Sequence, residues 1–182
     1  MNCTRLDEEF PFTAAIKRSP GVHLMDVIKD MARELFNAGL KYVDGVPDPV
    51  MFEKGFIWER LLSRAFGDDK VTRPGEIMCD GIACSPDGIE VDEAGEIVVW
   101  EYKCTTMGTK HSPEDTWSWK MQALGYCHVV GANTAIFRIL HLLRDWKEER
   151  HVYAVWRLEF TDAEIEDTWM SIVNHAKMRG WV

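Results

Sequence analysis

The chain has 182 residues, a length that fits one domain with a full-sized hydrophobic core. Apolar residues make up 46% of it and charged residues 28%, which is ordinary for a soluble globular protein. The N-terminus lacks a basic region followed by an apolar one, and no apolar run approaches the ~18 residues of a membrane span. These features argue against secretion and against a membrane partner.

The net charge and the cysteine content bear on the expected partners and the cellular compartment. The formal net charge is −9, whereas a nucleic-acid binder usually shows a basic balance or a basic stripe. This counts against nucleic acid as a partner without excluding it, because a local basic channel can coexist with an acidic remainder. The five cysteines form no CxxC pair and no zinc pattern with histidine, so we expect reduced thiols in a cytoplasmic protein.

The first part of the chain predicts two helices. Residues 1–20 are expected to be irregular, and apolar residues then recur at helical spacing from Leu24 to about Leu40. A loop rich in glycine and proline follows. A second helical pattern covers residues 52–65 and stops before a glycine.

The apolar pattern changes to that of strands near residue 76. It predicts three strands, at Glu76–Cys84, Gly88–Val91 and Glu96–Cys104, with a turn between the last two. Because side chains two residues apart share one face of a strand, we expect Glu101 and Lys103 side by side. The opposite face of this strand is strongly apolar, which favours a sheet with helices on both sides.

The last third of the chain predicts two helices and two strands. Ser112, followed by proline and acidic residues, is a good helix start, and the helix is expected to end near Val130. Thr134–Leu143 and Val152–Phe160 have the pattern of strands. Thr161–Glu164 is a capping box that opens a final amphipathic helix.

Together these elements predict one α/β domain over residues 1–182. We expect a central mixed sheet of about five strands, flanked by helices on both faces. No internal repeat, low-complexity segment or linker divides the chain.

Two carboxylates and one ammonium are expected to converge on the predicted sheet. Asp87 lies between two of its strands, and a hairpin can bring it beside Glu101 and Lys103. Oxygen ligands suit Mg²⁺, which needs only one or two carboxylates from a protein. A metal held there could polarise a phosphoryl oxygen and lower the pKa of an attacking water. The three residues therefore suggest a divalent-metal site with a lysine at its edge.

These residues resemble the signature of the PD-(D/E)xK nuclease superfamily, which Pro86-Asp87 and Glu101-Tyr102-Lys103 match in order. Gln122-Ala-Leu-Gly-Tyr126 looks like the QxxxY motif of the RecB-like and bacteriophage exonuclease branch, to which lambda exonuclease belongs. Gly55-Phe-Ile-Trp-Glu59 resembles the GxxxE motif on the preceding helix of that branch. The resemblance implies a restriction-endonuclease-like core and a metal-dependent DNA exonuclease of phage-type recombination, repair or DNA processing in a bacterial or phage-infected cell.

The resemblance also implies roles for single residues. Asp87 and Glu101 would hold one or two Mg²⁺ or Mn²⁺ ions, with the backbone carbonyl of Tyr102 as a further ligand. Glu59 would serve a second metal or a metal-bound water, unless it is a solvated surface glutamate. Lys103 would orient the nucleophilic water or stabilise the charged transition state.

At other positions a structural role is the alternative to a functional one. Gln122 and Tyr126 would contact Lys103 or the nucleic-acid backbone, although an aromatic residue on a helix face is often plain core. His23 could reach the metal or the phosphate, or be structural. A mixture of cations and aromatics could receive DNA, or be core and loop residues: Lys110, His111, Trp117 and Lys120.

The resemblance further implies DNA as the partner, as linear duplex or single-stranded ends, with a homo-oligomer and a single-strand annealing or binding protein as additional partners. No cysteine follows Cys127, so we expect no iron–sulfur cluster. The alternatives are an endonuclease on the same core, a non-catalytic DNA-binding or assembly module, and an acidic metal-binding protein without a nucleic-acid role.

Overall fold

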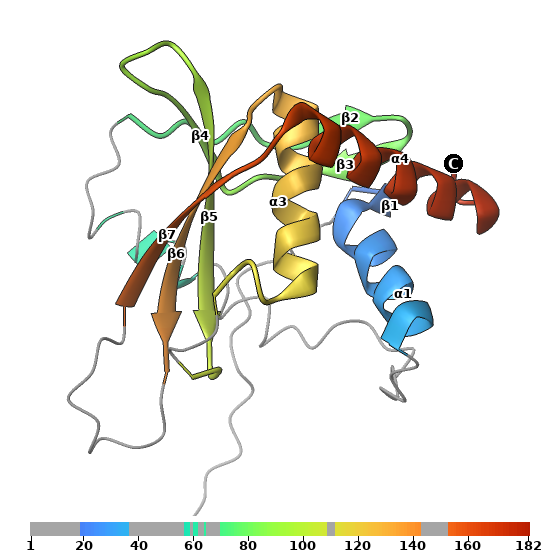
Figure 1. The fold of residues 1–182 in the computed structure, drawn as a ribbon, viewed down its shortest axis with the longest axis horizontal. Helices are drawn as coiled ribbons and strands as arrows, with labels where there is room; N and C mark the ends of the chain where they lie inside the picture. Colours follow the sequence, from blue (N-terminus) through green and yellow to red (C-terminus); the bar gives the residue numbers. More distant parts are fainter. Residues whose placement is uncertain are drawn as a thin grey trace, which may run out of the picture.

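The computed structural model describes residues 19–36, 57–58, 60–61, 64, 70–108, 112–142 and 153–182. Figure 1 shows a long twisted sheet on one side, a group of helices beside it and a smaller sheet behind the helices. The α/β class predicted from the sequence is confirmed. The elements, in chain order, are β1 (Val22–His23), α1 (Leu24–Phe36), β2 (Ile77–Cys79), β3 (Ile82–Cys84), β4 (Gly88–Val91), β5 (Ile97–Thr105), α3 (Trp117–Val130), β6 (Thr134–His141), β7 (Tyr153–Glu159) and α4 (Asp162–Met178).

The larger sheet is mixed and has the strand order β4-β5-β6-β7. β5 pairs antiparallel with β4 and parallel with β6, which pairs antiparallel with β7. In the register of β5 and β6, Glu101 lies opposite Phe137, and Lys103 lies opposite Ile139. Because paired residues point to the same face of a sheet, these four side chains share one face. The alternation predicted for β5 is therefore confirmed.

The smaller sheet has the order β1-β3-β2 and corrects one sequence prediction. The pattern predicts a single strand over Glu76–Cys84, but this segment folds back on itself as the hairpin β2–β3. Asp80 has φ 48° and Gly81 has φ 79°, as a two-residue type I′ turn requires. The described strands form sheets of four and three strands in place of the predicted single sheet of about five.

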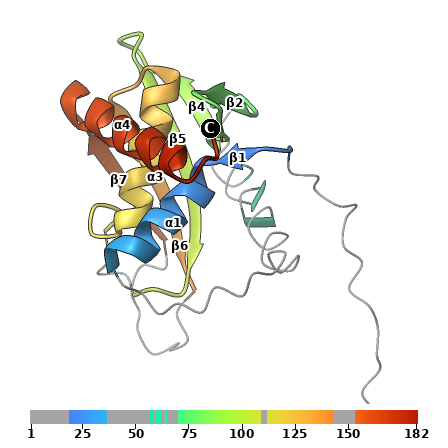
Figure 2. The same ribbon diagram turned by 90° about the vertical axis from the view of Figure 1, so that its right-hand side faces the viewer.

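α3 packs on the face of the larger sheet that carries Glu101 and Lys103, and α1 and α4 pack against α3 (Figures 1 and 2). Phe137 and Ile139 of β6 are fully buried beneath α3. On the opposite face, the guanidinium of Arg138 lies 4.3 Å from the ring centre of Trp100. Of the second predicted helix, residues 57–58, 60–61 and 64 are helical, and the others lie outside the described residues.

α3 begins later than predicted. Ser112 and Asp115 bond to each other, with Ser112 Oγ 2.7 Å from the carboxylate, and they close a separate turn. Thr116 then has an extended backbone (φ −98°, ψ 92°), so the helix starts at Trp117. The predicted end is confirmed, because Gly131 adopts φ 70°, the left-handed conformation common after a helix.

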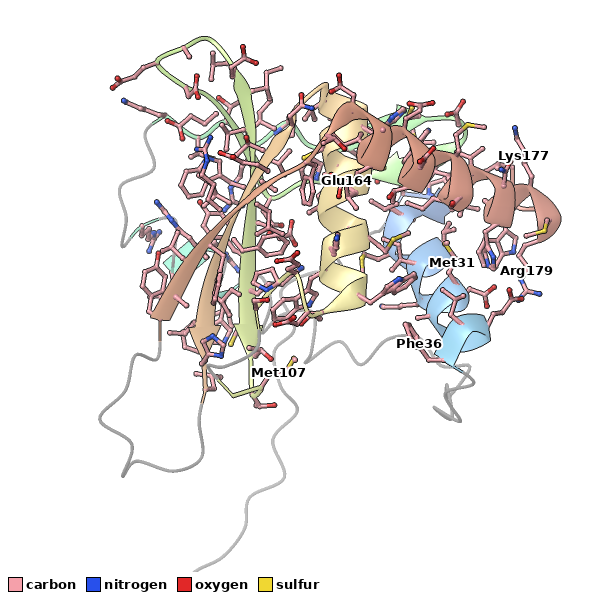
Figure 3. The ribbon with its side chains drawn as sticks, viewed as in Figure 1. Met31, Phe36, Met107, Glu164, Lys177 and Arg179 are labelled. Atoms are coloured by element: carbon pink, nitrogen blue, oxygen red, sulfur yellow. The ribbon has the colours of Figure 1, made fainter. Side chains whose placement is uncertain are left out.

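Both ends of α4 are fixed by hydrogen bonds. The predicted capping box is present: Thr161 Oγ1 accepts from the Glu164 backbone at 3.2 Å, and the Glu164 carboxylate accepts from the Thr161 backbone at 2.9 Å. At the other end, Arg179 Nε donates to Asp30 of α1 at 2.7 Å, and His175 Nε2 lies 2.9 Å from the same oxygen. Figure 3 shows Glu164 and Arg179 at the opposite ends of this helix. Within the described ranges, no helix has the length and apolarity needed to cross a membrane.

Candidate active site

β5 carries two of the predicted site residues on the face beneath α3. Glu101 is buried, and its Oε1 accepts a hydrogen bond from Nζ of Lys103. The strand forms here because Ile97–Thr105 is rich in β-branched and aromatic residues, and its period of two places the carboxylate and the ammonium together. The Glu101 side chain is 4% exposed and that of Lys103 is 19% exposed, so the ammonium is the more accessible group.

Asp87 is held against β5 at the point where β4 begins. It lies in the bend between β3 and β4, directly before the Gly88–Trp100 pair that opens the β4–β5 ladder. Its Oδ2 accepts the backbone N–H of Tyr102 at 2.8 Å. The Asp87 carboxylate thus adds one hydrogen bond to β5 directly before the first residue of β4. The hairpin brings Asp87 to the Glu101 position of β5, as the sequence predicts.

Gln122 connects these side chains to α3. Its Oε1 accepts from Lys103 Nζ at 2.8 Å, while its Nε2 donates to Glu101 Oε1 at 3.0 Å and to the Tyr126 hydroxyl at 3.1 Å. Gln122 and Tyr126 are both buried, and their i,i+4 spacing puts them on the helix face that covers the sheet. The structure therefore brings together Asp87, Glu101, Lys103, Gln122 and Tyr126, as predicted.

The electrostatics of the site follow from its burial. Burial raises the pKa of Asp87 above its ordinary value, although the positive charge of Lys103 opposes the rise. Burial, followed by the negative charges of Glu101 and Asp87, raises the pKa of Tyr126 well above its ordinary value. The Tyr126 hydroxyl therefore stays protonated at neutral pH, and the two carboxylates form a local concentration of negative charge.

This donor set fits a hard divalent cation. Asp87 and Glu101 offer carboxylate oxygens, which Mg²⁺ and Mn²⁺ prefer, and a bound cation would offset the buried negative charge. The carbonyl of Tyr102 lies on the same strand edge as its N–H, which is the Asp87 edge, so the predicted backbone ligand is compatible with the fold. Among the described residues, the groups of three His, Cys, Asp or Glu ligands do not include Asp87 or Glu101, so waters would complete the coordination.

His23 has structural contacts. It ends β1 and pairs with Ala83 of β3. Its Nε2 lies 3.1 Å from the carbonyl oxygen of Ser19, and its Nδ1 lies 3.7 Å from the carboxylate of Glu76. The imidazole is buried. These contacts fit the structural alternative, and a metal or phosphate role for His23 stays a prediction.

Two of the predicted nucleic-acid contacts can be placed. Trp117 packs edge-to-face on Phe36, with ring centroids 5.6 Å apart, and lies at the rim of the core. The charge of Lys120 acts on Glu164 at the start of α4. The position of Trp117 agrees with the alternative of a core tryptophan, and contact of either residue with DNA stays a prediction. The predicted residues that lie outside the described part of the chain are Glu59, Lys110 and His111.

Two further residues near the site carry no motif. Arg73, in the segment before β2, carries a positive charge that opposes the rise which burial causes in the pKa of Asp87. His141 ends β6 on the face of Lys103, two residues beyond the one that pairs with that lysine. It is buried, its Nδ1 lies 2.9 Å from a backbone carbonyl, and its Nε2 has no hydrogen-bond partner in the described part of the chain. The alternation along β6 could have pointed to His141, whereas no sequence signal marks Arg73.

Comparison with known proteins places the fold. No protein-family model matches the sequence, and no curated protein matches it. The crystal structure of SSO0001 is similar, with a TM-score of 0.54 and 18% identity over 90% of this chain and 77% of that chain. The complex of LHK-Exo with dAMP has a TM-score of 0.51 and 18% identity, over 87% of this chain and 89% of that chain.

LHK-Exo is an alkaline exonuclease from Laribacter hongkongensis. A phage-related exonuclease from Haemophilus somnus 129PT also matches, with a TM-score of 0.50 and 12% identity over 85% of this chain and 79% of that chain. At these identities the likeness is one of fold. The chain has the fold of these exonuclease structures, which confirms the predicted resemblance at that level.

Proposed function

We propose that this chain is a metal-dependent DNA exonuclease, which hydrolyses phosphodiester bonds at DNA ends in phage-type recombination, repair or DNA processing. The observation that carries the proposal is the convergence of Asp87, Glu101, Lys103 and Gln122 on one face of the sheet. The exonuclease structures that share the fold support the same reaction class.

Each residue of the site has a distinct task in this reaction. Asp87 and Glu101 would hold Mg²⁺ or Mn²⁺, which when bound polarises the phosphoryl oxygen and lowers the pKa of the attacking water. Lys103 Nζ is fixed between Glu101 and Gln122. From that fixed place it can orient the water or stabilise the charge that develops on the phosphoryl group. Gln122 positions Lys103 and does not itself need to touch the substrate.

The net charge of −9 bears on how DNA is held. Phosphate neutralisation supplies most non-specific DNA affinity, and an acidic chain offers little of it. We therefore expect modest affinity for DNA ends, unless a homo-oligomer or a single-strand annealing or binding protein adds contacts. Binding should weaken further with salt, because the remaining contacts are with phosphates.

The test is a comparison of DNA topologies. The protein is incubated with Mg²⁺ or Mn²⁺ and matched linear duplex, nicked circle, closed circle and single-stranded DNA, with Lys103→Ala in parallel. We expect degradation of linear DNA and intact closed circles, with the activity lost in the variant. Cutting of closed circles would instead establish an endonuclease. DNA binding without cleavage under every condition would establish a non-catalytic module.

The metal site has its own test. Calorimetric titration of Mn²⁺ into the wild-type protein and Asp87→Ala should show binding that is lost or strongly weakened in the variant. Unchanged Mn²⁺ binding in Asp87→Ala would contradict the assignment of this carboxylate, whatever the outcome of the cleavage assay.

A further inference from the structure

A second cluster of potential metal ligands lies away from the proposed active site. It consists of Cys79 at the end of β2, Asp80 in the β2–β3 turn and His128 in the last turn of α3. One ligand atom from each residue lies within 4.8 Å of the others. Figures 1 and 2 show the β2–β3 hairpin beside α4, so three separate parts of the fold meet at this cluster.

The separation of the Cys79 and Asp80 ligand atoms suits one small metal ion. Sγ of Cys79 lies 3.8 Å from Oδ2 of Asp80. Two ligands on tetrahedral zinc, with Zn–S near 2.3 Å and Zn–O near 2.0 Å, are about 3.5 Å apart. The sulfur and oxygen are therefore within a few tenths of an ångström of the separation that a shared zinc ion requires, and the His128 nitrogen lies within 4.8 Å of both. His128 is half-buried and Asp80 is exposed, so the cluster is open to solvent from one side.

The ligands are held in place by α4. The ring of Trp169 stacks on His128 with centroids 4.6 Å apart and an interplanar angle of 12°. The same indole donates through Nε1 to Oδ2 of Asp80 at 2.8 Å. Glu166, one turn before Trp169, has a carboxylate oxygen 3.4 Å from Nδ1 of His128. A carboxylate beside a ligating imidazole orients the ring and increases its basicity, and indirect support of this kind is typical of metal sites.

A second group of three potential metal ligands lies at the C-terminal end of α4, and its charge balance differs from that of this cluster. Asp30, Glu34 and His175 also come together there. Arg179, however, donates to both carboxylates, so their negative charge already has a cationic partner. An added metal ion would be repelled by the guanidinium. At Cys79, Asp80 and His128, by contrast, the described contacts of Asp80 are with a neutral indole and a thiol.

We propose that Cys79, Asp80 and His128 form a site for a transition-metal ion of the Zn²⁺ class, with water as the fourth ligand, distinct from the hard-cation site at Asp87 and Glu101. Sulfur, imidazole nitrogen and carboxylate oxygen together select Zn²⁺ or Co²⁺ and disfavour Mg²⁺. Binding would displace the thiol proton. Because the thiolate is the ligand, the affinity should fall as the pH falls.

The proposed Zn²⁺ site lies on elements that also carry parts of the proposed active site. His128 follows Tyr126 by two residues on α3, and β3 leads directly into the bend that carries Asp87. A metal bridge between the β2–β3 hairpin and α3 would fix the two elements that carry these parts of the active site. Because the metal ion would bind only the folded state, it would also raise the free energy of unfolding by mass action.

Titration of Co²⁺ into the reduced, metal-free full-length protein provides the test. We expect a thiolate-to-cobalt charge-transfer band that corresponds to one Co²⁺ per chain and that Zn²⁺ abolishes by displacing this Co²⁺. Cys79→Ser should lose the band, and His128→Gln should weaken Co²⁺ binding strongly. Glu166→Gln should weaken it by roughly 10- to 100-fold, the effect of removing the partner of a ligating histidine.

Two matched controls separate this site from other metals and thiols. Asp87→Asn removes a proposed catalytic ligand and should leave the charge-transfer band unchanged, because the hard-cation site contains no sulfur. Cys104→Ser, which changes a half-buried thiol outside the cluster, should also leave it unchanged. A wild-type protein without the band, or a band that survives in a folded Cys79→Ser, would overturn the proposal. If Cys79→Ser does not fold, unchanged Co²⁺ affinity in His128→Gln would overturn it equally.

Discussion

Asp87 is a residue whose burial opposes folding. The side chain is half-buried beside Glu101, and the desolvation of its carboxylate raises its pKa. A group with a raised pKa in the folded state contributes stability at low pH that is lost as the pH rises through that pKa. The ionised form of Asp87 is therefore less favourable in the metal-free folded protein than in the unfolded chain, as is common where a site is built to bind a cation.

We predict that Asp87→Asn abolishes metal-dependent cleavage and stabilises the metal-free protein by about 1 kcal/mol at pH 8. Asparagine can still accept the Tyr102 N–H through its amide oxygen, but it brings no charge. The stability difference should shrink as the pH falls through the pKa of Asp87. Urea unfolding of both proteins at pH 8 and in mild acid measures this. A variant that is less stable at pH 8 would contradict the prediction.

The contribution of Asp30 to stability should depend on pH in the opposite way to that of Asp87. Burial acts to raise its pKa, but hydrogen bonds from His175 and Arg179 outweigh that effect and lower it. A lowered pKa contributes stability above the unfolded-state value that is lost as the pH falls through the folded-state value. Asp30→Asn should therefore destabilise the protein by about 1–3 kcal/mol at neutral pH, less in acid. Unfolding curves over the same pH range test this, and equal stability of both proteins at pH 7 would argue against it.

Gln122 is the residue that couples β5 to α3, since its amide bonds to Glu101, Lys103 and Tyr126. Gln122→Ala should lower stability by about 1–3 kcal/mol, because buried polar groups lose their partners. It should also reduce the cleavage rate, because Lys103 keeps only one of its two fixed contacts. Tyr126→Phe removes one hydrogen bond from the same amide and should cost about 1 kcal/mol. Chemical unfolding and single-turnover cleavage measure both effects. A Gln122→Ala protein with the wild-type rate would refute its positioning role.

The contacts of these residues differ in how far the sequence predicts them. Glu101 and Lys103 are predictable because the period of a strand alone places them together. Gln122 and Tyr126 follow from helical spacing together with the recognised motif. Arg73 has no such regularity, because it lies in an irregular segment and meets Asp87 only through tertiary folding.

At the scale of elements, α1 and α3 cross at Gly125. A Cβ at this position would lie 2.9 Å from Cδ2 of Leu24, closer than atoms in real structures approach. The glycine of the QxxxY segment thus allows α1 to pack directly beside Gln122 and Tyr126. Its absence of a side chain matters more than its low helix propensity.

We predict that Gly125→Ala destabilises the protein even though alanine favours a helix by about 1 kcal/mol. Overpacking against Leu24 should cost about 1–3 kcal/mol and outweigh that gain. The double variant Leu24→Ala/Gly125→Ala should be more stable than the sum of the single changes predicts, by roughly 1 kcal/mol. Thermal unfolding of the four proteins forms the cycle. Additive effects would show that the two residues do not compete for space.

Element boundaries show where local patterns are insufficient. The apolar content of Glu76–Cys84 correctly predicts strand structure. The prediction of one continuous strand is wrong, because Asp80-Gly81 is a dipeptide that favours a two-residue hairpin turn. The helix start at Ser112 is a true local capping signal that closes only a turn, because the extended Thr116 interrupts it. The Thr161 capping box is predicted correctly because the helix continues directly from it.

At the scale of the whole molecule, one layer of helices connects the two sheets. α3 contributes Gln122 to the proposed active site and His128 to the proposed Zn²⁺ site. The sequence does not predict the second site, because its ligands come from segments about 50 residues apart, with no characteristic spacing. The fold shared with exonuclease structures was predictable from the order of motifs and elements in this sequence, although the identity to the LHK-Exo structure is only 18%.

The central claim is that Lys103 and its carboxylate partners cleave phosphodiester bonds. The most direct measurement is the single-turnover rate of Mg²⁺-dependent cleavage of an end-labelled linear duplex by the wild type, Lys103→Ala and Lys177→Ala. Lys177 lies near the C-terminal end of α4 and serves as the matched control (Figure 3). We predict a loss of about 100-fold or more in Lys103→Ala and no change in Lys177→Ala. A Lys103→Ala protein that cleaves at the wild-type rate would contradict the account.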